Sequence, residues 1–425
     1  MSSAGDGTAE AATEPPPLFR QPEFLKLWAA QSISQLGDQV TLLALPLVAV
    51  LTLDASAAQM GFLVAAELMP HLLFSLFAGV WIERSQRRRH LMILADVARA
   101  GLLVSVPVAA AFDLLSFPQL YAVAFAVGSF AVMFDISYST LFIAVVPRRD
   151  ILEANSKLSL SRSVSFVTGP SLAGFLVQLV TAPVTLLLDA FSFLGSALFL
   201  TRIRTKEPVV EHDGNGVLRS LRDGMRFVLT DELIRPELFC AATVNLFNYV
   251  FHAIFVLYAT KELGVAPGTL GVALGLGAVG GILGALGAPR LERAIGIGPA
   301  MVIGAVLFPA PLILVPIASG SELKLGVMLA AAEFLSAVGV MIFDVSAVSM
   351  QFMRTPDRIR ARTAGTFRFV NYGIRPIGAL LGGALGTVIG LQTTLWVGAV
   401  GALAGVLWLV FSPIPRLREA PAEAA

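Results

Sequence analysis

The sequence has little charge and almost no cysteine. Only 14% of its 425 residues are charged, whereas 56% are hydrophobic, and the mean hydropathy is +0.79. A soluble domain carries about 25% charged residues, so water cannot be the solvent for most of this surface. The single Cys240 has no second cysteine with which to form an internal disulfide or a metal site. We therefore expect an integral membrane protein whose main partner is lipid.

Further absences exclude several activities. A net charge of +1 gives no bulk attraction to nucleic acid, so no nucleic-acid partner is expected. No Gly-x-x-x-x-Gly-Lys-Ser/Thr loop occurs to hold ATP phosphates. No cofactor or metal is predicted, and any energy should come from an ion gradient. Residues 1–23 lack the basic start and short apolar core of a secretory signal, which predicts a disordered cytoplasmic tail.

Long apolar runs are what the sequence has in abundance. A helix needs about 20 mostly apolar residues to cross a bilayer, and the runs show no ten-residue alternation typical of barrel strands. The fold class expected is all-α, with twelve transmembrane helices. We place them near 24–52, 59–82, 91–111, 118–146, 158–181, 183–201, 237–260, 267–289, 299–318, 323–350, 362–389 and 392–411.

Lysine and arginine fix the expected orientation. Most of the 30 basic residues fall in segments on one side of the predicted spans, and only Lys261 and Lys324 fall on the other. Basic loops stay in the cytoplasm, so both termini should be cytoplasmic in a multi-pass protein of the inner or plasma membrane. We expect a monomer.

The two halves of the chain resemble each other at a shift of about 209 residues. Phe134-Asp135-Ile136-Ser137 returns as Phe343-Asp344-Val345-Ser346, and Pro147 returns as Pro356. Each half holds six spans, which predicts two parallel six-helix pseudo-repeats with a small-molecule site between them. The boundaries expected are 24–201 and 237–411 for the bundles and 412–425 for a cytoplasmic tail. The linker, 202–236, contains either a short amphipathic helix on the membrane surface or a solvated tether.

On these residues the chain resembles the major facilitator superfamily over essentially its whole length. Residues 79–88 read Gly-Val-Trp-Ile-Glu-Arg-Ser-Gln-Arg-Arg, similar to the superfamily's loop between the second and third helices. Glu replaces the usual Asp, and Gln replaces the second Gly. The resemblance implies alternating access, with a gating loop that contains Gly79, Glu83, Arg84, Arg87 and Arg88.

Further segments narrow the resemblance to one branch. Residues 94–99, 147–155 and 158–163 look like the macrolide-efflux and enterobactin-exporter branch. Gly169-Pro170-Ser171-Leu172-Ala173-Gly174 is similar to the fifth-helix motif of drug/proton antiporters, which implies a helix bend around Gly169, Pro170 and Gly174. The function implied is proton-coupled antiport that exports small amphipathic drug, macrolide or siderophore-like molecules.

Ionisable residues inside the spans are the candidate site. A charge in a membrane costs several kcal/mol unless it faces a cavity or a partner, and desolvation makes a carboxyl easier to protonate. Polar residues also share single helical faces in the first and seventh spans. The residues predicted to line the substrate or proton pathway are Asp38, Asp135, Glu333, Asp344, Gln31, Gln35, Asn245, Asn248 and His252. The alternative for each carboxylate is a structural charge pair.

Three other intramembrane groups have more than one interpretation. Glu67 and His71, four residues apart, share a proton or simply pack. Asp96 and Arg99, three apart, are predicted to form a structural charge pair. Arg375 pairs with a carboxylate or holds an anionic substrate, and the sequence does not choose between them.

Three competing functions remain. An ion-coupled importer or facilitator of a metabolite would use the same architecture. An intramembrane hydrolase could use Asp135 and Asp344 as an aspartate pair, but neither lies in a Gly-x-Gly-Asp motif, and the repeat explains the pair without catalysis. A sensor would need a domain that transmits signals, and the tails and linker are short. The sequence therefore favours a transporter, not an enzyme.

Overall fold

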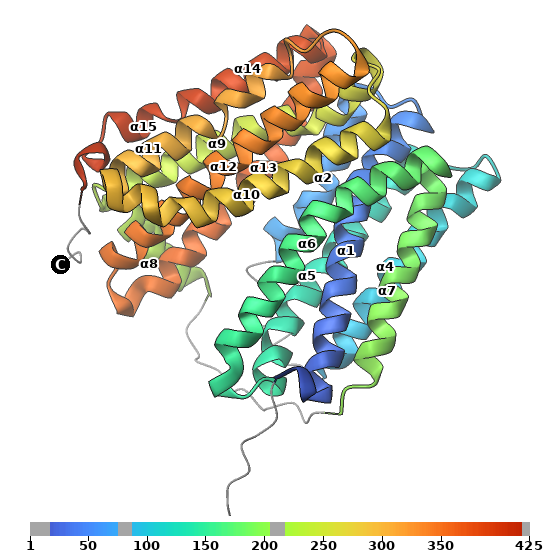
Figure 1. Ribbon diagram of the computed structural model, residues 1–425, viewed down its shortest axis with the longest axis horizontal. Coiled ribbons are helices and arrows are strands. Elements are labelled where there is room, and N and C mark those ends of the chain that lie inside the picture. Colours follow the sequence, from blue (N-terminus) through green and yellow to red (C-terminus); the bar gives the residue numbers. More distant parts are fainter. Residues whose placement is uncertain (1–17, 75–86, 205–216, 419–425) are drawn as a thin grey trace, which may run out of the picture.

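The structure, a computed structural model, describes residues 18–74, 87–204 and 217–418. Within those ranges the chain is helical and contains no strand (Figure 1). Eleven helices are long and apolar enough to cross a membrane. A twelfth, α6 (Ile151–Leu179), has 29 residues and carries Glu153, Lys157 and Arg162 near its start. The all-helical fold class predicted from the sequence is confirmed.

Six long helices form the first group. They are α1 (Pro22–Leu51), α2 (Ala57–Phe74), α4 (Arg88–Ala111), α5 (Phe117–Val145), α6 and α7 (Ala182–Thr201). Helix α1 packs against α6 and α7, α4 against α5 and α7, and α2 against α5. A core within this group includes the buried side chains of Leu27, Met92 and Leu200, whereas Leu103 and Phe193 belong to a larger apolar cluster that continues into the second group.

The second group follows a short helix in the predicted linker, α8 (Val217–Thr230), which packs on α13 and α9. Its members are α9 (Ile234–Leu257), α10 (Pro267–Ile295), α11 (Ile297–Leu307), α12 (Glu322–Arg354), α13 (Arg360–Ile389), α14 (Leu391–Ala404) and α15 (Leu407–Val410). Asp231 fixes the start of α9, because its Oδ1 accepts hydrogen bonds from the backbone N–H groups of Leu233 and Ile234.

Two predicted spans are interrupted. The span predicted over 299–318 is present as Ile297–Leu314 but is not one continuous α-helix, because α11 ends at Leu307 and a 3₁₀ turn, η4 (Ala310–Leu314), follows. Pro309 and Pro311 lack the N–H groups that an α-helix would need there. The helix expected over 392–411 is also divided, with α14 ending at Ala404 and α15 beginning at Leu407.

The internal repeat is visible in the element order. Helix α5 is followed by Pro147, the 3₁₀ turn η2 (Arg148–Asp150) and α6. Helix α12 is followed by Pro356, the 3₁₀ turn η5 (Asp357–Ile359) and α13. The same sequence signal produces the same turn, and Asp135 and Asp344 lie at matching places on the preceding helices.

The halves meet mainly at two helix crossings, α2 with α13 and α6 with α10, with smaller contacts of α1 and α2 against α9. A Cβ atom on Gly61 would lie 2.8 Å from the Cα of Gly383, and one on Gly174 would lie 3.1 Å from the Cα of Gly271. Only glycine permits backbones this close. The crossings lie at the end of the molecule where α1 leads into α2, and the groups diverge toward α8 (Figure 1). Asp54 and Lys261 form an ion pair between the halves at the same end.

Candidate functional site

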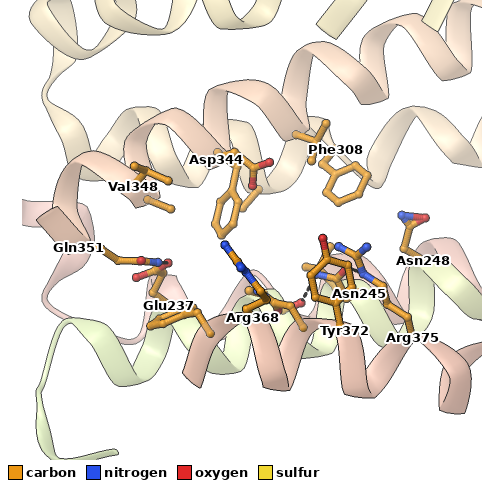
Figure 2. Close-up of a pocket in the computed structure, with 18 of the residues that line it drawn as sticks. Glu237, Asn245, Asn248, Phe308, Asp344, Val348, Gln351, Arg368, Tyr372 and Arg375 are labelled. Carbon is orange, nitrogen blue, oxygen red and sulfur yellow. Dashed lines mark hydrogen bonds between the residues drawn. The ribbon is translucent and has the colours of Figure 1, made fainter. Parts of the chain in front are cut away.

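A cavity of about 480 Å³ lies within the C-terminal group of helices. It is bordered by α9, α12 and α13, with Ala305 and Phe308 closing one wall. This volume is in the range of pockets that bind drug-sized molecules. The polar side chains that line it are Glu237, Asn245, Asn248, Tyr249, Asp344, Gln351, Arg368, Asn371, Tyr372 and Arg375 (Figure 2).

Glu237 supplies an acidic group at one end of the cavity. It lies in the first turn of α9 and is only 1% exposed. The Gln351 side-chain amide donates to its Oε1 at 2.5 Å, and its buried Oε2 has no hydrogen-bond partner in the described chain. A buried carboxyl oxygen without a donor is costly, so this oxygen either carries a proton or awaits a donor from the cavity.

Arg375 supplies a basic group at the other end. Its Nε donates to the Asn245 Oδ1 at 3.2 Å, and its guanidinium carbon lies 4.7 Å from the ring centre of Tyr372 and 5.4 Å from that of Tyr249. Among the described residues no carboxylate lies within ion-pair distance of it. The ring faces and the amide therefore hold the cation in place of an anion.

Asp344 and Arg368 lie between these ends. Asp344 projects from α12 and Arg368 from α13, on facing sides of the cavity (Figure 2). Both are exposed to the cavity, and no salt bridge joins either of them to another described residue. With Glu237 and Arg375 they give the cavity two acidic and two basic side chains, arranged so that its two ends have opposite polarity.

A second polar cluster lies in the N-terminal group, around Arg99. Its Nη1 donates to Asp38 Oδ1 at 2.8 Å and its Nη2 donates to Asp96 Oδ1 at 2.5 Å. The Arg99 and Asp96 side chains are 0% exposed, whereas that of Asp38 is 40% exposed. One cation is thus shared by two carboxylates, only one of which reaches the surface of the protein.

Aromatic rings and hydroxyl groups complete this cluster. The guanidinium carbon of Arg99 lies 4.4 Å from the ring centre of Phe193 and 4.9 Å from that of Phe134. Nearby, the hydroxyl groups of Thr41 and Ser192 donate to the buried Asp189. Asp189 was not among the predicted pathway residues. Its hydrogen bond with Thr41 connects α7 to α1, which indicates a structural role.

The other predicted pathway residues divide by location. Asn245, Asn248 and Asp344 line the cavity, whereas Asp135 is exposed on α5 of the other half. Gln31 and Gln35 lie on α1, each with a buried side-chain oxygen that has no partner in the described chain. His252 and Glu333 do not line the cavity. Glu333 packs instead against α10, where a Cβ atom added to Gly277 would lie 3.1 Å from the Cβ of Glu333.

The predicted proton pair is not joined by a hydrogen bond in the described residues. Glu67 and His71 both lie on α2, but the His71 ring stacks on Tyr372 of the other half, with 5.5 Å between ring centres. This contact connects α2 to the basic end of the cavity. It arises from the crossing of α2 and α13, which the sequence did not predict.

The gating loop lies mostly outside the described residues. Gly79, Glu83 and Arg84 fall in the undescribed segment 75–86, whereas Arg87 is exposed and Arg88, at the start of α4, is 1% exposed. In the predicted helix-bend motif, Gly169 lies against Gln39 of α1 and Gly174 against Pro267 of α10. The motif thus borders both halves.

Sequence reasoning missed Glu237, Gln351, Asn371 and Tyr372. The signal was present in the helical spacing, because the stripe through Asn245 and Asn248 continues two turns back to Glu237. On α13, Arg368, Tyr372 and Arg375 follow the same spacing. Glu237 and Gln351 were overlooked because they lie at the predicted ends of spans, where a polar residue is unremarkable, and Asn371 and Tyr372 because they carry no charge.

The family is shown by a match over almost the entire chain. The model of the transmembrane secretion effector family, a group of major facilitator transporters, matches residues 13–425. The chain belongs to this family. Because members of this family are transporters and not enzymes, membership excludes the intramembrane-hydrolase alternative.

Characterised relatives of the transporter are efflux pumps. It is 27% identical to the multidrug efflux pump Tap of Mycolicibacterium fortuitum, over 94% of this chain and 97% of that protein. It is 26% identical to the multidrug efflux pump Tap of Mycobacterium tuberculosis, over 94% of this chain and 95% of that protein.

Solved structures show the same fold at low identity. A bacterial homologue of the iron transporter ferroportin, in an inward-facing state, superposes with a TM-score of 0.75 at 17% identity, covering 93% of this chain and 99% of its own. The nucleoside transporter NupG superposes with a TM-score of 0.70 at 15% identity, covering 91% and 98%. The architecture of the transporter is therefore that of the major facilitator fold.

Proposed function

We propose that the transporter exports small amphipathic molecules, of drug, macrolide or siderophore-like kind, across the plasma membrane by proton antiport. The observation that carries the proposal is its similarity, over almost the whole of both chains, to multidrug efflux pumps. A drug-sized cavity with both polar and aromatic walls suits cargo of this kind.

The Arg99 cluster supports proton coupling through Asp38. Because Arg99 neutralises only one negative charge, the two carboxylates cannot both be compensated by it. Asp96 is fully buried, so Asp38, with its 40% exposed side chain, is the group that can exchange a proton with water. We assign Asp38 as the principal proton site. Asp135 and Asp344, each exposed on its helix, are further candidates.

The meeting of the halves at one end supports alternating access. Basic residues gather at the opposite end, which we place in the cytoplasm together with both termini. The glycine crossings and the Asp54–Lys261 ion pair would then close the extracellular side. Rocking of one half against the other would open it, with the loop at residues 79–89 latching the inward-closed state.

An ion-coupled importer or facilitator remains the second candidate. The similar solved structures include proteins titled as a nucleoside transporter and a metal transporter, so the fold supports several cargoes and does not fix the direction. The efflux-pump relatives favour export.

Transport into inside-out vesicles tests the proposal. We expect a fluorescent amphipathic amine to accumulate when the lumen is acidic and accumulation to stop when a protonophore removes the gradient. Asp38→Asn should lower gradient-driven accumulation by about tenfold or more, because an amide cannot take up and release the coupled proton. The control variant is Glu262→Gln, which removes an exposed carboxylate from the C-terminal group of helices. It should behave as wild type.

Two results would contradict this proposal separately. Accumulation that is independent of the gradient in the wild type would remove proton antiport but leave export. Uptake seen only in right-side-out vesicles would favour the importer.

A further inference from the structure

The cavity in the C-terminal half is electrically balanced but polarised. It holds two carboxyl side chains, Glu237 and Asp344, and two guanidinium side chains, Arg368 and Arg375. Asp344 and Arg368 project from opposite walls near the middle, whereas Glu237 and Arg375 lie toward the two ends (Figure 2). A molecule with a single charge would satisfy one end of the cavity and leave the other without a partner.

Each end has capacity for a ligand. The Oε2 atom of Glu237 is buried and has no donor in the described chain. At the basic end, Arg375 has no ion pair among the described residues, and the Asn248 and Asn371 side-chain oxygens beside it are buried without donors. Unsatisfied buried polar atoms of this kind are rare in folded proteins, and here they cluster along one cavity.

The helix geometry sets the distance between the two ends. Arg375 is held by Asn245, which lies eight residues after Glu237 on α9. At about 1.5 Å of rise per residue, the two ends are separated by about 12 Å along the helix axis. A cavity of about 480 Å³ accommodates a drug-sized ligand over that length.

We propose that this cavity binds a zwitterionic, drug-sized molecule, with a protonated amine at Glu237 and an acidic group at Arg375. The proposal deepens the export function above, because such a molecule would be its cargo. The amine donates to Oε2 of Glu237 while Gln351 keeps hold of Oε1, and the carboxylate pairs with the guanidinium that Asn245 and the tyrosine rings position. The phenylalanine side chains Phe308, Phe343 and Phe367 contact the apolar middle of the ligand.

Equilibrium binding to the purified, full-length protein tests this assignment. Three fluorescent probes share one dansyl-labelled chain: an amino acid whose amine and carboxylate are about 12 Å apart, its methyl ester, and its N-acetyl derivative. We expect the zwitterion to bind about tenfold more tightly than either derivative, since each derivative leaves Glu237 or Arg375 without a charged partner.

Two variants should each remove one preference. Glu237→Gln should bind the zwitterion no more tightly than the N-acetyl probe, and should still prefer the zwitterion to the ester. Arg375→Gln should bind the zwitterion no more tightly than the methyl ester, and should still prefer the zwitterion to the N-acetyl probe. Glu237→Asp and Arg375→Lys keep the charges, so they should restore most of each preference and separate a lost charge from a disturbed fold. Glu262→Gln is the matched control on the same polypeptide half.

The proposal is overturned if wild-type protein binds all three probes equally. It is also overturned if Glu237→Gln and Glu237→Asp both weaken the binding of all three probes to the same extent. Tighter binding of the ester than of the zwitterion would identify a cation site instead and would equally reject the assignment. Because binding is measured without a membrane or a gradient, these outcomes are independent of whether the vesicle experiment shows antiport.

Discussion

Replacing Arg99 by Gln should destabilise the protein by about 3–5 kcal/mol, the range found when one partner of a buried ion pair is removed. Asp96 is 0% exposed and would remain in an apolar core without its cation. The variant also loses the contacts of the guanidinium with the Phe134 and Phe193 rings. Unfolding by denaturant in detergent, followed by tryptophan fluorescence, measures the change.

Neutralising the stranded carboxyl provides the control for this prediction. The Asp96→Asn/Arg99→Gln double variant should recover a large part of the lost stability, because no unpaired charge then remains in the core. Asp38→Asn alone should cost much less, since Arg99 still pairs with Asp96. If the double variant is no more stable than Arg99→Gln, the loss comes from packing and not from the charge on Asp96.

Enlarging a glycine at the crossings should open the end where the halves meet. A Cβ atom on Gly271 would lie 2.3 Å from the Pro170 carbonyl oxygen, and one on Gly61 would lie 2.7 Å from that of Ala379. Backbone cannot move aside as a side-chain tip can, so Gly271→Leu should disfavour the closed arrangement by about 1–3 kcal/mol. That free energy corresponds to about a 5–150-fold change in the conformational equilibrium.

Spin labels at Thr52→Cys and Glu262→Cys, next to the Asp54–Lys261 ion pair, report the separation of the two halves. The native Cys240 is buried and should not be labelled. We expect the short-distance population to fall in Gly271→Leu and in Gly61→Leu. Gly287→Leu on the same helix, α10, should change nothing, because no atom lies within 4 Å of a Cβ there. An unchanged distance distribution in both crossing variants would contradict a gating role for these contacts.

The two predictions concern different parts of one mechanism. The Arg99 cluster lies within one half and combines the buried Arg99–Asp96 ion pair with the more exposed Asp38 carboxyl. Asp38 can therefore take up or release a proton without a rearrangement of the buried pair. The glycine crossings involve both halves, so they respond when one half moves against the other. A variant of the first kind should change stability and coupling, whereas a variant of the second kind should change which end of the molecule is closed.

The sequence by itself determined the membrane class, the helical fold and the internal repeat. Its low charge left lipid as the only solvent for the surface, and its apolar runs were long enough to cross a bilayer. The repeat placed Asp135 and Asp344 at equivalent positions before matching prolines. These features depend on neighbouring residues along the chain, so composition and spacing are enough to show them.

Only the tertiary structure decided which ionisable groups meet. Asp38 lies 61 positions from Arg99, Gln351 lies 114 positions from Glu237, and His71 stacks on a tyrosine of the other half. Helical spacing gives the face on which a side chain lies but not the helix it faces, so it could not show that Asp344 lines the cavity and Glu333 does not. The close glycine crossing of α2 with α13 sets the last of these contacts, because backbone-to-backbone contact fixes how the two helices are rotated against each other.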